Sequence, residues 1–295
     1  ARWQLRARGE WVWDLLIYAV LILMTVISIF PILHVLSVSL SNNHEVTRAG
    51  LMLWPRGFTL ASYEFIFKGP ALIRSFGVTV FITVVGTALN MLLTTSAAYA
   101  LAREDLPGRG IITLFIVITM VFSAGIIPGY MLVRSLGLIN SVWAMIFPGA
   151  VSAFNLILMR NFIQQLPASF IEAARIDGAS EWRILTQIVV PLSLPALATI
   201  GLFYAVAHWN EFFRGIFYIV DSTKWPLQVL LRSIVIEADL NQLGMTNQDL
   251  YGRLPVSQIT IRAATVIATI IPIAMVYPFL QKYFVTGVVL GGEKE

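Results

Sequence analysis

Long apolar segments alternate with shorter polar segments along the whole of this chain. Six of the apolar segments are long enough to cross the hydrocarbon core of a bilayer as helices, since one crossing takes about 20 residues. These predicted spans are Val12–Leu40, Ile73–Leu101, Ile111–Val133, Val142–Ile163, Leu194–Val220 and Ile261–Tyr283. The pattern predicts an all-α integral membrane protein whose residues 1–295 form a single transmembrane domain.

The composition agrees with a lipid environment. Of the 295 residues, 58% are hydrophobic and 12% are charged, whereas a soluble domain is about 45–50% apolar and about 25% charged. The absence of cysteine excludes disulfides and cysteine-ligated metals. The net charge of +4 is modest and the basic residues are scattered, which argues against nucleic acid as a partner.

An even number of spans places both termini on one side of the membrane, and the basic residues indicate which side. Short cytoplasmic loops carry an excess of Lys and Arg. Three arginines precede the first span and two lie in the 102–110 loop, whereas the short loop on the opposite side holds only Arg134. We therefore expect both termini, the 102–110 loop and the 164–193 loop in the cytoplasm of a bacterium, with the chain in its inner membrane.

The loop between the fourth and fifth spans, residues 164–193, has the pattern of two short helices joined by a sharp turn. Pro167 and Ser169 favour the start of the first helix, and Gly178 can end it with a positive φ. The second helix is predicted over Glu181–Ile188. Judged by these residues alone, an amphipathic surface helix between two spans is a sufficient description.

This loop resembles the EAA loop of the permease subunits of bacterial ABC importers. The matching residues are Glu172-Ala173-Ala174, then Gly178, then Ile188 and Pro191. Val190 departs from the family, which usually has Leu there, and the change is conservative. In that family the loop is a coupling helix that docks in a cleft of the ATPase subunit. The resemblance implies ATPase docking by Glu172, Ala173, Ala174, Arg175, Asp177 and Gly178.

Other segments are similar to the carbohydrate branch of these importers, in particular to the maltose-permease-like subunit with six spans. They are Ala98-Tyr99-Ala100-Leu101-Ala102-Arg103, Trp209-Asn210-Glu211-Phe212, and the C-terminal run that starts at Tyr277. The resemblance implies a type I ABC importer permease fold and import of an oligosaccharide. The long segment 224–258 is typical of subunits that handle complex or acidic oligosaccharides, and alginate is the specific candidate.

The resemblance also implies the other subunits of the transporter. The chain has no Gly-x-x-x-x-Gly-Lys-Ser/Thr phosphate loop, so ATP and Mg²⁺ are expected on separate subunits, and this chain is expected to be non-catalytic and to carry no cofactor. The implied partners are a second permease subunit, two ATP-binding subunits, an extracytoplasmic solute-binding protein and the oligosaccharide itself.

Polar residues interrupt the apolar fifth span. Ionisable groups inside a membrane cost roughly 2.5–3.5 kcal/mol each by insertion scales, so they should face a watery path or another protein. Aromatic faces, amides and carboxylates are suited to sugars. The candidates for the translocation path are Tyr204, His208, Trp209, Asn210, Glu211 and Arg214. Two alternatives stay open: a cluster that holds helices together, and mutual neutralisation of Glu211 and Arg214 on one helix face.

Three other functions are kept as alternatives. An importer of a non-sugar solute would share the coupling loop, although the Trp-Asn-Glu-Phe stretch argues against it. An ion-coupled secondary transporter would usually show inverted repeats and a relay of intramembrane carboxylates. A membrane-embedded enzyme would need a catalytic constellation, and neither a His-Glu-x-x-His run nor a nucleophile elbow occurs in the sequence.

Overall fold

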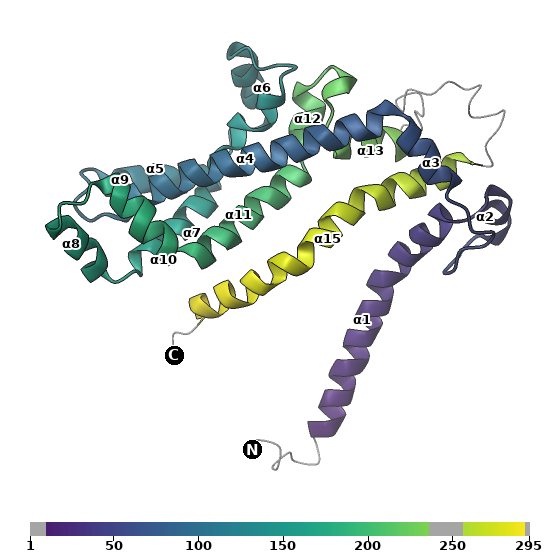
Figure 1. Ribbon diagram of the computed structural model, residues 1–295, viewed down its shortest axis with the longest axis horizontal. Coiled ribbons are helices and arrows are strands. Elements are labelled where there is room, and N and C mark those ends of the chain that lie inside the picture. The colour runs from purple at the N-terminus through teal and green to yellow at the C-terminus, as the bar shows by residue number, and fades with distance from the viewer. Residues whose placement is uncertain (1–9, 236–255, 293–295) are drawn as a thin grey trace. The chain divides into compact units, whose positions relative to one another are not determined.

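The structure is a computed structural model that describes residues 10–235 and 256–292, and the regular elements of these residues are helices (Figure 1). The chain separates into two compact units, which are described here one at a time. Unit 1 consists of Ala1–Pro70 and Ser233–Ile271, and unit 2 consists of Ala71–Arg232 and Pro272–Glu295. The predicted all-α membrane fold is confirmed.

Unit 1 contains one long apolar helix with small helices at its end. Its elements are α1 (Glu10–Ser39), α2 (Asn43–Ala49), α3 (Ala61–Lys68) and the first part of α15 (Gln258–Gly292). The side chains of α1 are exposed from Leu15 to Leu33. A helix that is apolar all round and uncovered by its own chain is suited to lipid or to another membrane subunit.

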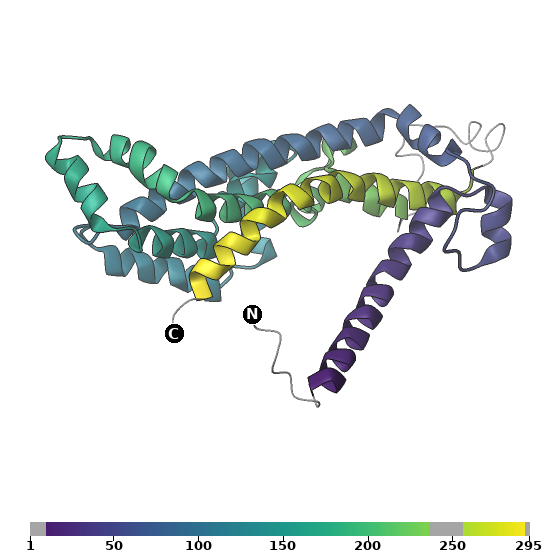
Figure 2. The same cartoon turned by 60° about the horizontal axis from the view of Figure 1, so that its bottom comes forward.

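Unit 2 holds most of the helices and the segments of interest for function (Figures 1 and 2). Its helices are α4 (Pro70–Ala102), α5 (Arg109–Val121), α6 (Ile126–Ser135), α7 (Ala153–Gln164), α8 (Ala168–Ile176), α9 (Glu181–Ile184), α10 (Val190–Leu192), α11 (Leu194–Trp209), α12 (Phe213–Tyr218), the larger part of α13 (Leu227–Val235) and the last part of α15. Four short helices are η1 (Val142–Met145), η2 (Phe147–Gly149), the π-helical η3 (Leu185–Val189) and η4 (Ser222–Lys224). Both views show α4 and α11 running side by side.

Three of the apolar segments are continuous helices in the described residues, and two others are bent. The helices α1, α4 and α15 are each long and apolar enough to span a membrane. Two of the other segments bend, by 118° between α5 and α6 and by 50° between η2 and α7. The third bend, of 86°, joins Glu181–Leu192 to α11 and so lies just before the fifth predicted segment. Counted with each bent pair as one span, the structure has up to six spans.

The helix in the fifth apolar segment ends earlier than the sequence predicts. We predicted a span from Leu194 to Val220, but α11 ends at Trp209 and α12 begins at Phe213. The Asn210 side-chain amide donates to the carbonyl oxygen of Val206 at 2.9 Å. This bond adds to the helical one, since the backbone N–H of Asn210 bonds the same carbonyl at 3.1 Å. On the other side of the break, the Glu211 carboxylate accepts from the backbone N–H of Arg214 in the first turn of α12 at 3.0 Å, and such bonds make a break tolerable inside a membrane.

The helices α4 and α11 approach closely at a glycine. A Cβ atom added to Gly86 in α4 would lie 2.6 Å from Nε2 of His208 in α11. His208 is 2% exposed, so its ring has little space into which it can move. Glycine at this position allows the two helices to pack at this distance.

We predict that Gly86→Ala destabilises the protein by about 1–3 kcal/mol, because the added methyl group overpacks the contact with His208. Gly77→Ala is the matched control, since Gly77 lies in the same helix and a Cβ there meets no atom within 4 Å. Thermal unfolding of the two detergent-purified variants provides the measurement. The close contact is refuted if both variants unfold at the temperature of the unmodified protein.

Candidate functional site

The first helix of the loop between α7 and α11 begins and ends close to the predicted residues, but its start is capped differently. The helix α8 begins at Ala168 after Pro167, and no side chain caps it. The expected cap from Ser169 is therefore wrong, because this residue lies inside the helix. Gly178 follows α8 with a φ of 77°, as predicted. In the second helix, the Ser180 side chain accepts from the backbone N–H of Arg183 and caps α9.

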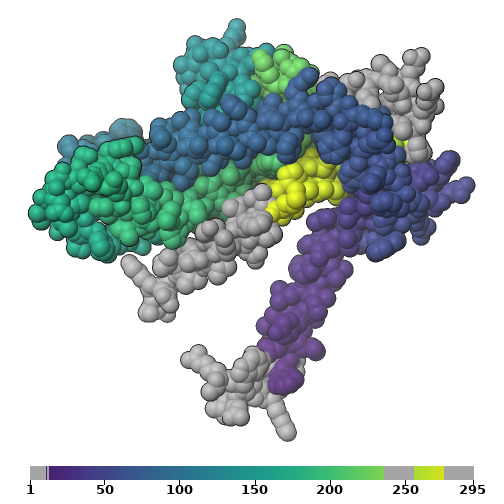
Figure 3. All heavy atoms as spheres, in the orientation of Figure 1, coloured from purple at the N-terminus to yellow at the C-terminus, as the bar shows by residue number. Residues whose placement is uncertain are grey.

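The two sides of α8 differ in character. Ile171 and Ala174, with Ala179 after the helix, pack against the hydrophobic cluster of unit 2. Away from these contacts, Phe170 is 52% exposed and Ile176 is 87% exposed. The α8–α9 hairpin, residues 168–184, lies at one end of unit 2, at the left in Figures 1 and 3. An exposed apolar side chain on such a protruding helix is suited to contact with another protein.

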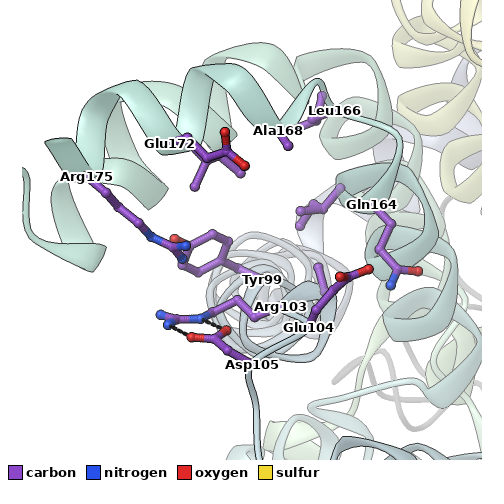
Figure 4. Close-up of a pocket in the computed structure, with 12 residues that line it drawn as sticks. Tyr99, Arg103, Glu104, Asp105, Gln164, Leu166, Ala168, Glu172 and Arg175 are labelled. Atoms are coloured by element: carbon purple, nitrogen blue, oxygen red, sulfur yellow. Dashed lines mark hydrogen bonds and ion pairs between the residues drawn. The ribbon is translucent and has the colours of Figure 1, made fainter.

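The residues that the motif predicted for docking are divided between these two sides. A pocket, described below, lies between α8 and the rest of unit 2. Ala173, Asp177 and Gly178 are exposed and do not line it. Glu172 and Arg175 line that pocket (Figure 4), and Ala174 packs on the hydrophobic cluster. Sequence reasoning did not single out Phe170 and Ile176, although two large apolar residues in an otherwise polar loop are a readable signal.

The pocket behind α8 has a volume of about 380 Å³. It lies between α8, the ends of α4 and α7, and the loop that follows α4 (Figure 4). Its lining includes Tyr99, Arg103, Glu104, Asp105, Gln164, Glu172 and Arg175. Charged groups of both signs therefore meet at the place where α8 faces the rest of unit 2.

A carboxylate beside this pocket connects three elements. Glu181, the first residue of α9, accepts from the Tyr99 hydroxyl at 2.5 Å. Its other oxygen lies 2.7 Å from Nη1 of Arg103 and 3.4 Å from Nε of Arg175. Tyr99 is in α4, Arg103 directly follows it, and Arg175 is in α8. The four side chains therefore form one hydrogen-bonded ionic cluster, which we name the Glu181 cluster.

Arg103 has a second carboxylate partner nearby. Its Nε donates to Oδ1 of Asp105 at 2.9 Å and its Nη2 donates to Oδ2 at 2.5 Å. The hydrogen bond from Arg103 lowers the pKa of Asp105 to about 2, and the same bond raises the pKa of the Arg103 guanidinium. Both groups are therefore charged at any pH near neutrality.

The candidate path residues near the end of α11 bond largely within unit 2. The Tyr204 hydroxyl lies 2.7 Å from Oγ1 of Thr94 and accepts from the backbone N–H of Ser152 at 3.0 Å. Nε2 of His208 lies 3.0 Å from the side-chain amide of Asn90. Tyr204 and His208 are 3% and 2% exposed. These contacts hold α11 to α4 and to the start of α7.

The orientation of Asn90 that satisfies all its neighbours places its amide oxygen toward His208. Its nitrogen then donates to the carbonyl oxygens of Gly86 at 2.9 Å and of Ala150 at 3.2 Å. Ala150 and Ser152 lie at the bend between η2 and α7. Side chains from α4 and α11 thus bond the backbone at this bend as well.

Glu211 and Arg214 form an ion pair with each other at 2.7 Å. Glu211 also accepts from the backbone N–H of Arg214 at 3.0 Å, and Arg214 donates to the carbonyl of Met145 at 3.2 Å. A Cβ on Gly149 would lie 2.3 Å from the Arg214 guanidinium, so glycine makes room for it. The charges of Glu211 and Arg214 therefore neutralise each other inside unit 2. Mutual neutralisation is one of the alternatives left open by the sequence.

Three members of the predicted set reach the surface: Asn210, Trp209 and Arg214, whose side chain is 34% exposed. Asn210 is exposed and Trp209 is half-buried. The Trp209 ring meets Phe76 edge to face, with ring centres 6.0 Å apart. The six candidates therefore divide into three buried residues, Tyr204, His208 and Glu211, and three that are partly or fully exposed, Trp209, Asn210 and Arg214.

The bent spans and the protruding hairpin can be compared with known proteins. The family of binding-protein-dependent transport system inner membrane components matches residues 109–289, which include the hairpin and the break after α11. This chain belongs to that family. It is therefore a membrane permease subunit of an ABC importer and is not itself an enzyme.

Individual relatives agree with this membership. The polygalacturonan/rhamnogalacturonan transport system permease protein YtcP of Bacillus subtilis is 44% identical over 286 residues, covering 95% of this chain and 98% of the relative. The arabinooligosaccharides transport system permease protein AraQ of Halalkalibacterium halodurans is 30% identical, covering 91% and 92%. The family resemblance predicted from the sequence is confirmed.

A solved structure has the same fold. A chain of a bacterial ABC transporter involved in the import of the acidic polysaccharide alginate superposes with a TM-score of 0.89 at 32% identity. The match covers 95% of this chain and 99% of that one. The predicted type I ABC importer permease fold is confirmed.

Proposed function

We propose that this permease carries an acidic oligosaccharide across a bacterial inner membrane, driven by ATPase subunits that dock on the α8–α9 hairpin. The observation that carries the proposal is α8 itself. It protrudes from unit 2, exposes Phe170 and Ile176, and ends at a glycine with positive φ. A permease without a phosphate loop needs such a contact to receive the energy of ATP hydrolysis.

The exposed side of α8 is suited to close approach by a protein. Ala173 has a side chain of one methyl group, and Gly178 has none; among the described residues beyond its chain neighbours, no atom lies within 4 Å of a Cβ placed there. Burial of Phe170 and Ile176 against a partner would remove apolar surface from water, which favours association. We therefore assign docking to Ala173, Asp177 and Gly178 together with these two apolar residues. Glu172, Ala174 and Arg175 support the helix from behind.

The proposed orientation in the membrane rests on the basic residues near the two ends of unit 2. The end with α8 carries Arg103, Arg109, Arg160, Arg175 and Arg183. The end where the Asn140 side chain accepts from the backbone N–H of Asp221 at 3.0 Å carries as many, namely Arg74, Arg134, Arg214, Lys224 and Arg232. The short loops differ, since the 102–110 loop holds two arginines and the 134–141 loop holds one. Because the positive-inside rule weights such short loops, we infer that α8 lies in the cytoplasm. An even number of spans would then put both termini on that side.

The transport cycle requires partners besides the lipid. We propose a second permease subunit, two ATP-binding subunits, and a solute-binding protein that delivers the sugar from outside. Binding of ATP would draw the docked hairpins together and turn the path outward, and hydrolysis would reset it. For this to happen the ATP-bound partners must bind one conformation of the permease more tightly than the other.

The nature of the substrate is inferred from relatives and from the surface near the break after α11. One relative is named for polygalacturonan and rhamnogalacturonan, and the similar structure for alginate, an acidic polysaccharide. Trp209 and Asn210 offer an aromatic face and an amide at the surface, which are groups that bind sugars. We assign these two residues to the path, while Tyr204, His208, Glu211 and Arg214 hold its wall in place.

We predict that Gly178→Asp leaves the subunit in the membrane but prevents copurification of the ATPase subunits, because a charged side chain then occupies the docking surface. Gly108→Asp is the matched control: Gly108 has a φ of 75°, no atom within 4 Å of an added Cβ, and an exposed position. The two variants therefore carry the same backbone strain. Normal assembly and transport with Gly178→Asp would reject the docking assignment.

A second prediction concerns the substrate. In proteoliposomes that hold the complete complex, the binding protein loaded with an acidic oligosaccharide should stimulate ATP hydrolysis, and a neutral oligosaccharide of equal length should not. The reason is that only the delivered substrate stabilises the conformation that closes the ATPase pair. Equal stimulation by the neutral sugar would contradict the acidic specificity, and would leave the role of the permease itself in place.

A further inference from the structure

The Glu181 cluster lies where α8 meets the spans, and neither docking nor the path uses it. We propose that Glu181 is a positioning residue through which a displacement of α8 is passed to α4. The proposal rests on the docking proposed above, since it needs a partner that moves α8. Beyond docking, it names Glu181 as the contact that transmits the displacement of α8 to the membrane-spanning helix α4.

The contacts of α8 with the rest of unit 2 are of two kinds. Ile171 and Ala174 make apolar contacts with the hydrophobic cluster, and such contacts have no preferred direction, so they permit small sliding movements. The second kind runs through Glu181 at the start of α9, which forms an ion pair with Arg175 of α8 at 3.4 Å. Its contacts with Tyr99 and Arg103 at the end of α4 are charge-assisted, and such contacts are directional, shorter and stronger than neutral ones. The carboxylate therefore fixes the register of the hairpin against the end of α4.

The pocket of about 380 Å³ strengthens this argument. It leaves open space between α8 and the loop after α4, so packed atoms do not back the helix over this part of its length. A force applied to α8 is then carried at the rim of the pocket, by the hydrophobic cluster and by the Glu181 cluster. Figure 4 shows Arg175 and Tyr99 on this rim, with Arg103 beside Asp105.

The helix α4, which would receive the motion, also contacts α11 close to the break after Trp209. Tyr99 and Arg103 are one turn apart at the end of α4, and both contact Glu181. Further along the same helix, Thr94 bonds Tyr204 and Asn90 bonds His208. A movement of the end of α4 is thus connected by hydrogen bonds to the residues that precede Trp209. All of these contacts lie within unit 2.

The ion pairs of the Glu181 cluster are too exposed to contribute much to the stability of the fold. The side chain of Glu181 is 46% exposed and that of Arg175 is 40% exposed. Ion pairs with this exposure contribute little to stability. We therefore expect its removal to leave the folded subunit intact and to affect how motion of α8 reaches the spans.

The test compares Glu181→Gln with Asp105→Asn in the assembled complex in proteoliposomes. Each variant removes one negative charge and one carboxylate partner of Arg103 without changing side-chain size. Asp105 lies two residues from Arg103 in the same loop, so its loss leaves the link between α4 and the hairpin in place. Three quantities are measured for each: copurified ATPase subunits, the rate of ATP hydrolysis, and oligosaccharide transported per ATP hydrolysed.

We expect both variants to copurify the ATPase subunits. Glu181→Gln should lower transport per ATP by about fivefold or more, the low end of usual coupling between sites, whereas Asp105→Asn should keep the unmodified ratio. Glu181→Asp, which keeps the charge, should recover part of the loss. If Glu181→Gln does not accumulate in the membrane, Tyr99→Phe tests the same link, because it removes one hydrogen bond and keeps the ring in the hydrophobic cluster.

The outcomes separate this proposal from the proposed function. An unmodified ratio in Glu181→Gln, or in Tyr99→Phe where that variant replaces it, overturns the positioning role and leaves docking intact. Loss of copurification in Glu181→Gln also overturns it, because Glu181 would then belong to the docking surface. If the unmodified subunit itself fails to copurify any ATPase, the proposed function fails instead.

Discussion

A hydrocarbon environment offers no hydrogen-bond partner to the backbone, so every break in a span must be satisfied by the protein itself. Unit 2 meets this constraint at two bends with side chains from neighbouring turns or helices. At the bend before α7, Asn90 and Tyr204 bond the backbone of Ala150 and Ser152. At the break after α11, Asn210 and Glu211 bond backbone groups of the flanking helices. The bent spans of this permease depend on these few polar residues.

The same constraint explains why α4 is central to unit 2. Its middle holds Asn90 and Thr94, which bond α11, and its end holds Tyr99, which bonds Glu181 beside the hairpin. One continuous helix therefore connects the proposed docking site to the proposed path. A rigid helix with directional contacts at both places is a physically sufficient connection, since neither contact depends on packing alone.

The sequence predicted the features that depend on local pattern. Hydropathy located the apolar segments, the EAA loop identified the hairpin, and the positive φ of Gly178 followed from its place after a short helix. The bends were not predicted, because hydropathy counts apolar residues and is insensitive to the direction of the chain. The Glu181 cluster was also missed: Tyr99 and Glu181 are 82 residues apart, and a single sequence does not show that such distant polar residues meet. Of the residues proposed for the path, burial of Tyr204 and His208 could be learned only from the packing of α4 on α11.

Docking of α8 by an ATPase in the cytoplasm is the claim that can be measured most directly. The chain has no cysteine, so Ile176→Cys introduces a single thiol at a position that is 87% exposed on α8. The measurement is its labelling by a membrane-impermeant maleimide in vesicles of known orientation, with and without bound ATPase subunits. We expect labelling only from the cytoplasmic face, and protection when the ATPase subunits are bound. Labelling from the external face, or equal labelling with the ATPase subunits present, would contradict it.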